Sequence, residues 1–424
     1  MQLTNQDFII KNYSYNFTLL MIDALGFGAA YSMMIPTGFV PDVINQLTYS
    51  WFLPPLIISL FFLGIFFSQF VASAFRKKET YAKTDVIKWA IAERAGMLLL
   101  YFSLSPRLDS QVQVGLFFLF YAVFIFSAGA ILPSYFDMVS RILYKHRPLF
   151  FAINASLSSI SGFILSNYAE NIINNTSIVN GYRESLLIVI IVTTVSLVSL
   201  FLIREPKENL EEVRVKFFVE IKRKVAEWRN IYDSNIEIKY FCIANMVCAF
   251  PEAISPFYSI WLLESGFDKS TIAQWVALIF VGSGLGSFTV PIIGRLKGFK
   301  STYILALGFH CIATLFYLIN PLSLHYLIFL FTGLGLGCFM NSVSNIAIEL
   351  ATTGDAGNIN ALLGIFRMPG FVLLPLLVSF FINQISLVYI FISIILACWL
   401  SIYIVIKYIN NPINPKVRFW SSDS

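Results

Sequence analysis

Residues 245–261 have the sequence NMVCAFPEAISPFYSIW, in which Glu252 is the one charged side chain and stands between Pro251 and Pro256. The stretch belongs to a longer apolar run, 238–262. A helix of about 20 apolar residues crosses the hydrocarbon core of a bilayer, and a charged side chain at its centre costs about 2.5–3.5 kcal/mol on insertion scales. The rest of the sequence decides whether Glu252 lies inside a membrane and what holds it there.

The whole chain has the composition of a membrane protein. Of its 424 residues, 57% are hydrophobic and 12% are charged, whereas soluble domains carry roughly 25% charged residues. Twelve runs are long enough to span a bilayer: 17–40, 51–73, 85–105, 112–134, 150–170, 184–203, 238–262, 271–293, 301–319, 324–347, 359–382 and 385–408. The first run is too long for the core of a signal peptide, so we expect it to stay in the mature chain.

Lys and Arg are distributed unevenly between the predicted loops. They gather after the second, fourth and eighth predicted helices: Arg76, Lys77, Lys78 and Lys83, then Arg141, Lys145 and Arg147, then Arg295, Lys297 and Lys300. By the positive-inside rule, these loops and both termini are cytoplasmic, which predicts a multi-pass protein of the cell membrane. The net charge of +5 lies in such loops and does not indicate nucleic-acid binding.

A polar segment, 204–237, divides the predicted helices into two sets of six. Its apolar residues Phe218, Ile221, Val225 and Trp228 recur at helical spacing, which favours either a helix on the inner leaflet or a solvated linker helix. The string LFFLFYAV at 116–123 resembles LIFLFTGL at 327–334. We therefore predict an all-α fold with two six-helix halves, 1–203 and 238–424, and a cytoplasmic linker, 204–237. Internal repeats of this kind place a substrate site at their interface.

With this layout, the chain resembles the major facilitator superfamily over essentially its whole length. The loop after helix 8 is similar to the family's loop motif, with Gly294, Arg295, Leu296, Lys297 and Gly298, although it has no Asp. The first-half loop keeps only a basic run at 76–78, and residues 204–206, REP, are a common ending of helix 6 in the family. The stretches AER (92–94), KHRPLFFA (145–152) and QLTYS (46–50) are similar to a poorly characterised prokaryotic branch. The resemblance implies a secondary transporter whose helices 1, 4, 7 and 10 line a central cavity, and it implies no particular substrate.

Five charged residues inside predicted spans are candidates for proton coupling or substrate binding: Asp23, Glu93, Arg94, Glu252 and Arg367. Glu252 lies about 14 residues, or roughly 21 Å, along its helix and so near the midplane. It shares a polar stripe with Asn245, Cys248, Ser255 and Ser259. Burial favours the protonated carboxyl, and an arriving cation favours the ionised one, so that binding and protonation can be coupled. The alternative is a protonated Glu that donates one hydrogen bond to a neighbouring helix.

The other charged candidates have two interpretations each. Arg367 stays charged in any environment, so it either binds an anionic solute or pairs with Glu349 or a helix end at the inner gate. Asp23 and Arg94 are expected at similar depth, where they form either an ion pair or a proton relay, with Glu93 as a rival partner.

Further residues are predicted to line the cavity: Asn154, Asn245, Ser255, Asn341, Asn345, Phe250 and Tyr258. For the polar ones, helix packing is the alternative, and packing is the expected role of Gly282, Gly284, Gly286, Gly333, Gly335 and Gly337. The five cysteines lack paired spacing and are interpreted as packing residues, so no metal or cofactor is expected. An enzyme is not expected, because no nucleophile, base and orienting group can be placed together.

These features predict a secondary active transporter. Aromatic residues around a single acid favour proton-coupled export of an amphipathic or cationic compound. Two alternatives stay open: proton-coupled uptake of a polar metabolite through Asn154, Asn341 and Asn345, and a non-transporting membrane receptor or scaffold that has no need of Glu252. The expected partners are a small solute, protons and the lipid bilayer, without nucleic acid, and the expected state is a monomer.

Overall fold

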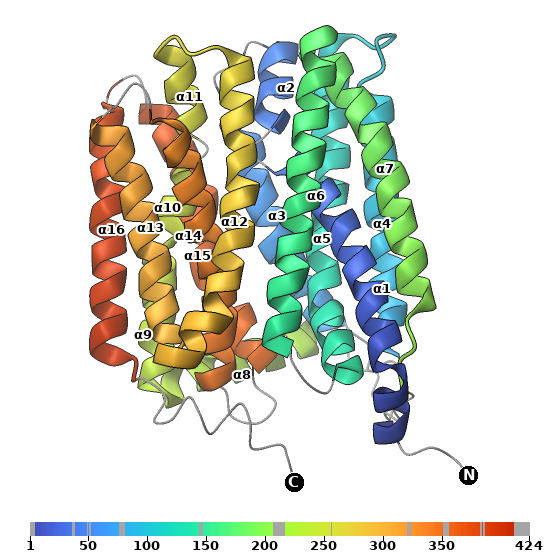
Figure 1. Ribbon diagram of the computed structural model, residues 1–424, viewed down its shortest axis with the longest axis vertical. Helices are drawn as coiled ribbons and strands as arrows, with labels where there is room; N and C mark the ends of the chain where they lie inside the picture. Colours follow the sequence, from blue (N-terminus) through green and yellow to red (C-terminus); the bar gives the residue numbers. More distant parts are fainter. Residues whose placement is uncertain are drawn as a thin grey trace. The chain divides into compact units, whose positions relative to one another are not determined.

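The computed structural model describes residues 5–35, 39–48, 50, 52–75, 81–143, 147–206, 217–255, 257–319, 324–350, 356–381, 384 and 386–410. Within these ranges every regular element is a helix, which confirms the predicted all-α class (Figure 1). The helices are α1 (Asn5–Met34), α2 (Phe39–Thr48), α3 (Leu53–Phe75), α4 (Ala82–Ser103), α5 (Ser110–Ile142), α6 (Arg147–Asn175), α7 (Ile178–Leu202), α8 (Phe217–Ser234), α9 (Ile236–Val247), α10 (Ala249–Ile254), α11 (Phe257–Glu264), α12 (Lys269–Lys297), α13 (Phe299–Ile319), α14 (Tyr326–Leu350), α15 (Ala356–Phe381) and α16 (Leu387–Tyr408).

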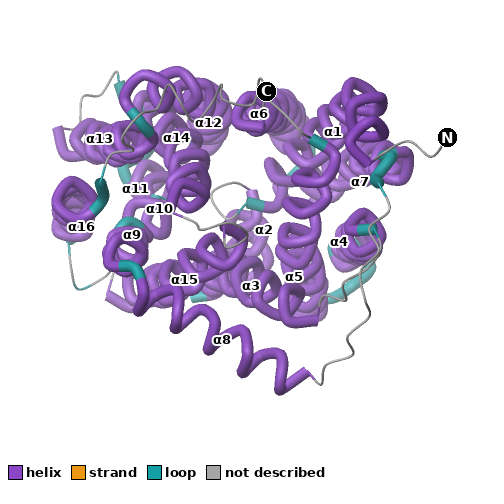
Figure 2. Tube along the Cα trace, turned by 90° about the horizontal axis from the view of Figure 1, so that it is seen from below, coloured by secondary structure: helices purple, strands orange, loops and turns teal. Residues whose placement is uncertain are grey.

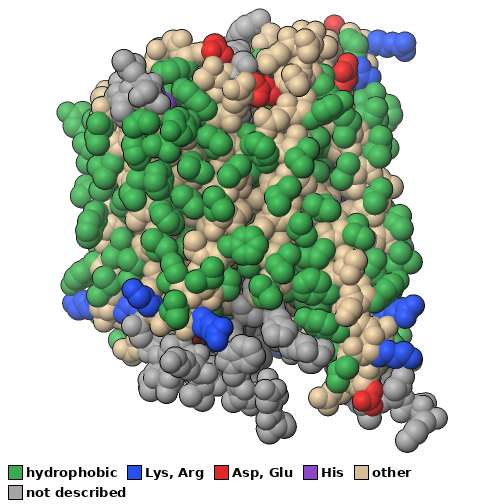
Figure 3. Space-filling model, viewed as in Figure 1, with side chains coloured by type: hydrophobic (Ala, Val, Ile, Leu, Met, Phe, Trp, Pro, Cys, Tyr) green, Lys and Arg blue, Asp and Glu red, His purple; other side chains and the backbone are tan. Residues whose placement is uncertain are grey.

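Eleven segments of the described chain are long and apolar enough to cross a membrane, and each coincides with one predicted run. The twelfth run, 85–105, corresponds to α4, which has 22 residues but carries Lys88, Glu93 and Arg94 along its length. Hydrophobic side chains cover the sides of the helices, whereas Lys and Arg side chains lie near helix ends (Figure 3). The chain is therefore a multi-pass membrane protein.

The predicted helix 238–262 is interrupted in the structure and forms α9, α10 and α11. Pro251 has no N–H to offer the carbonyl of Val247, and α9 ends at that residue. The carbonyl of Glu252 accepts a hydrogen bond from Oγ of Ser255 at 3.0 Å, and the next helix, α11, begins at Phe257. Glu252 thus lies on the short helix α10, between two breaks.

Two further boundaries differ from the prediction. α1 begins at Asn5 rather than residue 17, because its polar first turns continue the same helix. α2 covers residues that the sequence assigned partly to a loop. Its residues Val40, Val43 and Ile44 are buried in a hydrophobic core of unit 1 that also contains Met33 and Tyr121, and this burial stabilises the helix. The linker helix α8 is present as one regular helix (Figure 2).

Contacts divide the chain into two compact units. Unit 1 comprises Met1–Phe150 and Ile164–Ala226, and unit 2 comprises Phe151–Phe163 and Glu227–Ser424. These units differ from the predicted halves in the Phe151–Phe163 part of α6, where Oγ of Ser156 donates to the carbonyl of Gly284 at 3.3 Å. The predicted division into 1–203, 204–237 and 238–424 stays a prediction.

Glu205, which follows α7, binds the ends of neighbouring helices in unit 1. Its Oε1 and Oε2 accept the backbone N–H groups of Ala82 and Lys83, both at 2.9 Å, at the start of α4. Nη1 of Arg141, near the end of α5, lies 3.3 Å from Oε1. Nζ of Lys83 donates to the carbonyl of Ile203 at 2.8 Å, just after α7. Glu205 therefore joins the ends of three helices of unit 1.

Glycines allow α12 and α14 to pack backbone against backbone in unit 2. A Cβ atom added at Gly282 would lie 2.3 Å from the carbonyl oxygen of Leu330, and one at Gly337 would lie 2.0 Å from that of Ser283. Gly286 and Gly333 make equally close approaches. The predicted packing role of these four glycines is confirmed, and it follows the small-residue rule for helices in lipid.

We expect Gly337→Ala to lower stability by about 1–3 kcal/mol, because the added methyl group forces two packed helices apart. Gly308→Ala is the matched control, since a Cβ there meets nothing within 4 Å and replacing a helical Gly by Ala stabilises by up to about 1 kcal/mol. The measurement is the apparent melting temperature of the purified full-length protein in detergent. Equal melting temperatures for the two variants would contradict the close packing of α12 and α14.

Candidate functional site

Unit 2 contains a buried ion pair between Glu252 of α10 and Arg367 of α15. Nη2 of Arg367 donates to Oε2 of Glu252 at 2.7 Å, and the side chains are 6% exposed for Arg367 and 9% for Glu252. The breaks around α10 orient Glu252 toward α15, and Gly370 permits close contact because a Cβ there would lie 2.7 Å from Cβ of Ala249. The sequence suggested Glu349 or a helix end for Arg367, and the structure gives it Glu252.

Two aromatic rings enclose the guanidinium of Arg367. Its Cζ lies 4.8 Å from the ring centroid of Phe339 and 4.9 Å from that of Phe371. Aromatic faces attract a cation, and the attraction grows when water is excluded. The rings and the carboxylate together therefore form a site for a planar cation, which the side chain of Arg367 occupies.

Two polar atoms of this pair, Oε1 of Glu252 and Nε of Arg367, are buried and have no hydrogen-bond partner among the described residues, and the same holds for Oδ1 of Asn245. Leaving a buried polar group unpaired costs roughly 1–3 kcal/mol. Asn245 is fully buried and Cys248 is 1% exposed, so this part of the predicted polar stripe is buried within unit 2, whereas Ser255 and Ser259 are half-buried.

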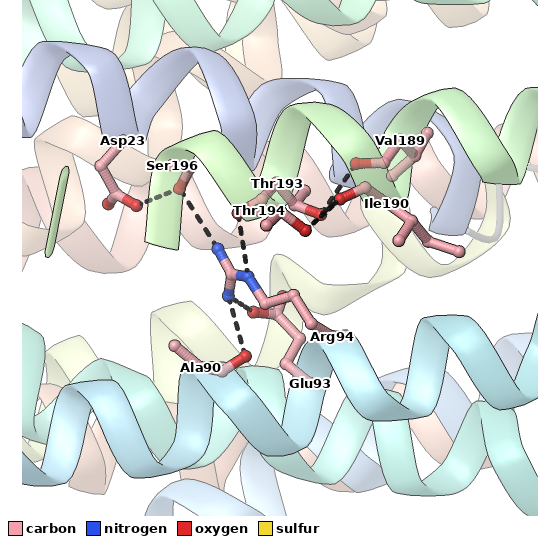
Figure 4. Close-up of polar contacts among 9 residues, drawn as sticks. All are labelled: Asp23, Ala90, Glu93, Arg94, Val189, Ile190, Thr193, Thr194 and Ser196. Atoms are coloured by element: carbon pink, nitrogen blue, oxygen red, sulfur yellow. Dashed lines mark hydrogen bonds and ion pairs between the residues drawn. The ribbon is translucent and has the colours of Figure 1, made fainter. Parts of the chain in front are cut away.

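Unit 1 contains a second buried cluster, shown in Figure 4. Oγ of Ser196 on α7 donates to Oδ1 of Asp23 on α1 at 2.6 Å, and Nη2 of Arg94 on α4 donates to the same Oγ at 3.2 Å. Nη1 of Arg94 forms an ion pair with Glu93. The predicted contact between Asp23 and Arg94 is thus bridged by a hydroxyl group, and the rival partner Glu93 holds Arg94 directly.

Backbone carbonyls complete the surroundings of Arg94. Its Nε donates to the carbonyl of Thr193 at 3.3 Å, and Nη1 donates to that of Ala90 at 3.3 Å. Gly26 brings α1 close to α7, since a Cβ there would lie 2.3 Å from Cβ of Ser196. Sequence reasoning missed Ser196. The buried hydroxyl residues at 193, 196 and 199 recur at helical spacing and could have indicated this polar face of α7.

The other residues predicted to line a cavity have local partners. Nδ2 of Asn245 donates to the carbonyl of Phe241 at 2.9 Å. Nδ2 of Asn341 donates to the carbonyl of Gly337 at 3.1 Å, and Nδ2 of Asn345 to the carbonyl of Asn341 at 2.7 Å. Asn341 and Asn345 are half-buried.

Tyr258 packs within unit 2. Its ring stacks on Phe391 with centroids 4.8 Å apart, and its hydroxyl group lies 3.0 Å from Oγ1 of Thr314. Phe250 and Asn154 are half-buried, and Ser255 binds its own helix as described above. The cavity roles of these residues stay predictions.

No protein-family model matches the sequence, and no curated protein sequence matches it. Solved structures do match its fold. The nucleoside transporter NupG aligns with a TM-score of 0.66 at 10% identity, covering 93% of this chain and 98% of that one. FucP, a major facilitator superfamily transporter in the outward conformation, aligns with a TM-score of 0.67 at 12% identity, covering 95% and 100%. The chain has the major facilitator superfamily fold.

A third solved structure also matches the fold. A POT family transporter in complex with 5-aminolevulinic acid aligns with a TM-score of 0.65 at 13% identity, covering 93% of this chain and 95% of that one. The resemblance predicted from the 6+6 layout is therefore confirmed at the level of the major facilitator superfamily fold.

Proposed function

We propose that this protein is a secondary active transporter that moves a small solute across the cell membrane by alternating access, and that it is not an enzyme. Its fold supports the proposal, because the solved structures named above are transporters. The basic loops favour cytoplasmic positions for both termini.

The observation that carries the mechanism is the buried contact between Glu252 and Arg367. A proton on Glu252 removes its negative charge and therefore ends the ion pair. Glu252 thus has two exclusive states, one bound to Arg367 and one protonated, and each state gives a different contact between α10 and α15. A two-state contact of this kind couples proton binding to movement of a helix.

Proton-coupled export of an amphipathic or cationic compound is the direction we propose. A carboxylate and two aromatic rings already hold the guanidinium of Arg367. A cationic solute would compete with Arg367 for Glu252, and a proton would then displace the solute.

Uptake of a polar metabolite is the second candidate. When Glu252 is protonated, Arg367 keeps its charge and loses its counter-ion, so it can bind an acidic group of a solute. The half-buried amides of Asn341 and Asn345 add hydrogen-bonding groups to the same helix as Met340, whose Sδ lies 3.8 Å from Nη1 of Arg367.

The test is solute flux in proteoliposomes with an imposed pH gradient, followed for a panel of cationic, zwitterionic and acidic compounds. We expect Glu252→Gln to lose proton-driven flux, because the amide cannot exchange a proton. Glu184→Gln is the control, since Glu184 is an exposed carboxylate on α7. Unchanged flux in Glu252→Gln would remove the coupling role, and no flux of any compound in the wild type would favour the receptor or scaffold alternative.

A further inference from the structure

The cluster in unit 1 contains two acids and one cation. Asp23 is 9% exposed and Glu93 is 5% exposed, and the side chain of Arg94 is 12% exposed. If all three were ionised, the cluster would carry a net charge of −1 (two carboxylates and one guanidinium). An uncompensated buried charge is costly, and a buried acid avoids the cost by keeping a proton.

Among the described residues, Arg94 is the cation that contacts this cluster. Other charged side chains on the helices around it have contacts of their own: Asp137 and Arg141 of α5 form an ion pair, and so do Asp85 and Lys88 of α4. On α7, Arg183 donates to the hydroxyl group of Tyr101, and Glu184 is exposed. The ion pair of unit 2 has no such surplus, because the negative charge of Glu252 is balanced by the positive charge of Arg367.

The geometry distinguishes the two acids. Glu93 touches the guanidinium of Arg94 directly. Asp23 is separated from it by Ser196, whose Oγ receives one hydrogen bond from Arg94 and gives one to Asp23. Arg94 therefore stabilises a charge on Glu93 more strongly than a charge on Asp23, since Coulomb attraction falls with distance.

We propose that Asp23 binds a proton at neutral pH, so that the Asp23–Ser196–Arg94–Glu93 cluster is a proton site separate from Glu252. The proposal follows from the charge balance of this cluster and does not depend on a coupling role for Glu252. Asp23 can release this proton when the attraction between Arg94 and Glu93 is weakened, because Arg94 then becomes available to Asp23 through Ser196.

Infrared spectroscopy of the purified full-length protein in nanodiscs tests this assignment, because protonated carboxyl groups absorb separately from carboxylates. At neutral pH, we expect Asp23→Asn to remove the signal of one protonated carboxyl group. Arg94→Gln should add one, because Glu93 then loses its counter-charge and also keeps a proton. Glu252→Gln should leave the signal unchanged, since that acid is ionised in its pair. Wild-type protein with ¹³C-labelled aspartate carboxyls should show the signal shifted in frequency.

Three results would overturn the proposal: an unchanged signal in Asp23→Asn, no shift on labelling aspartate, or no gain in Arg94→Gln. If Arg94→Gln does not fold, the labelled wild type and Asp23→Asn still decide the question. The flux assay on Glu252→Gln fails or succeeds separately, so a negative result here leaves the proposed function standing.

Discussion

Replacing Arg367 by Met is expected to lower the stability of the protein by about 3–5 kcal/mol, because the change leaves the buried Glu252 without its counter-charge. Methionine fills much of the same space between the rings of Phe339 and Phe371, so lost packing contributes little. Without Arg367, Glu252 avoids an unpaired buried charge by keeping a proton. Because that proton is easier to keep at low pH, the cost should fall as the pH falls.

A double-mutant cycle separates the pair from the packing around it. Arg367→Met together with Glu252→Gln removes both charges and should recover most of the loss. Arg183→Met is the control, since its guanidinium lies 4.7 Å from the ring centroid of Tyr101 and forms no ion pair among the described residues. The readout is the apparent melting temperature of each full-length variant. If the double variant is as unstable as Arg367→Met, the ion pair between Glu252 and Arg367 is not what stabilises this part of unit 2.

Much of the fold follows from local properties of the sequence. Hydropathy locates the spans because crossing a bilayer requires a long apolar helix, and α4 is recognisable although its charges exceed those of the other spans. The close approach of α12 and α14 follows from the spacing of their glycines. Such features depend on a single helix or on residues a few positions apart, and they need no knowledge of which helices touch.

The partners in the candidate sites depend on tertiary contacts. Glu252 and Arg367 are 115 positions apart, and neither carries a local signal for the other. Sequence reasoning therefore interpreted Glu252 as a lone acid, whereas the structure gives it a cation and makes the pair neutral. Asp23 and Ser196 are 173 positions apart, and a serine in an apolar helix is not distinctive. The surplus negative charge of the Asp23–Ser196–Arg94–Glu93 cluster can be recognised only when these contacts are known.

Replacing Glu205 by Ala is expected to lower stability by roughly 2–4 kcal/mol, because the buried N–H of Ala82 and the half-buried N–H of Lys83 both lose their acceptor, at about 1–3 kcal/mol for a buried donor. The side chain of Glu205 is fully buried in its contact with Arg141, and its two oxygens bind the first N–H groups of α4. Asp109→Ala is the matched control, since Asp109 precedes α5 without a side-chain bond to it. Melting temperatures of the full-length variants provide the comparison, and an equal effect in both would contradict the capping role.

The pH dependence of the same site distinguishes its two protonation states. Burial raises the pKa of Glu205, while the backbone N–H groups and Arg141 act in the opposite direction. Since the pKa is higher in the folded protein, the stability linked to this group is fully present at low pH and is lost as the pH rises through the folded pKa. Glu205→Gln imitates the protonated carboxyl group and should not show this loss. Raising the pH from below the ordinary pKa of a glutamate carboxyl, about 4.3, should therefore destabilise the wild type more than Glu205→Gln, and parallel melting curves over the range tested would show that Glu205 does not titrate there.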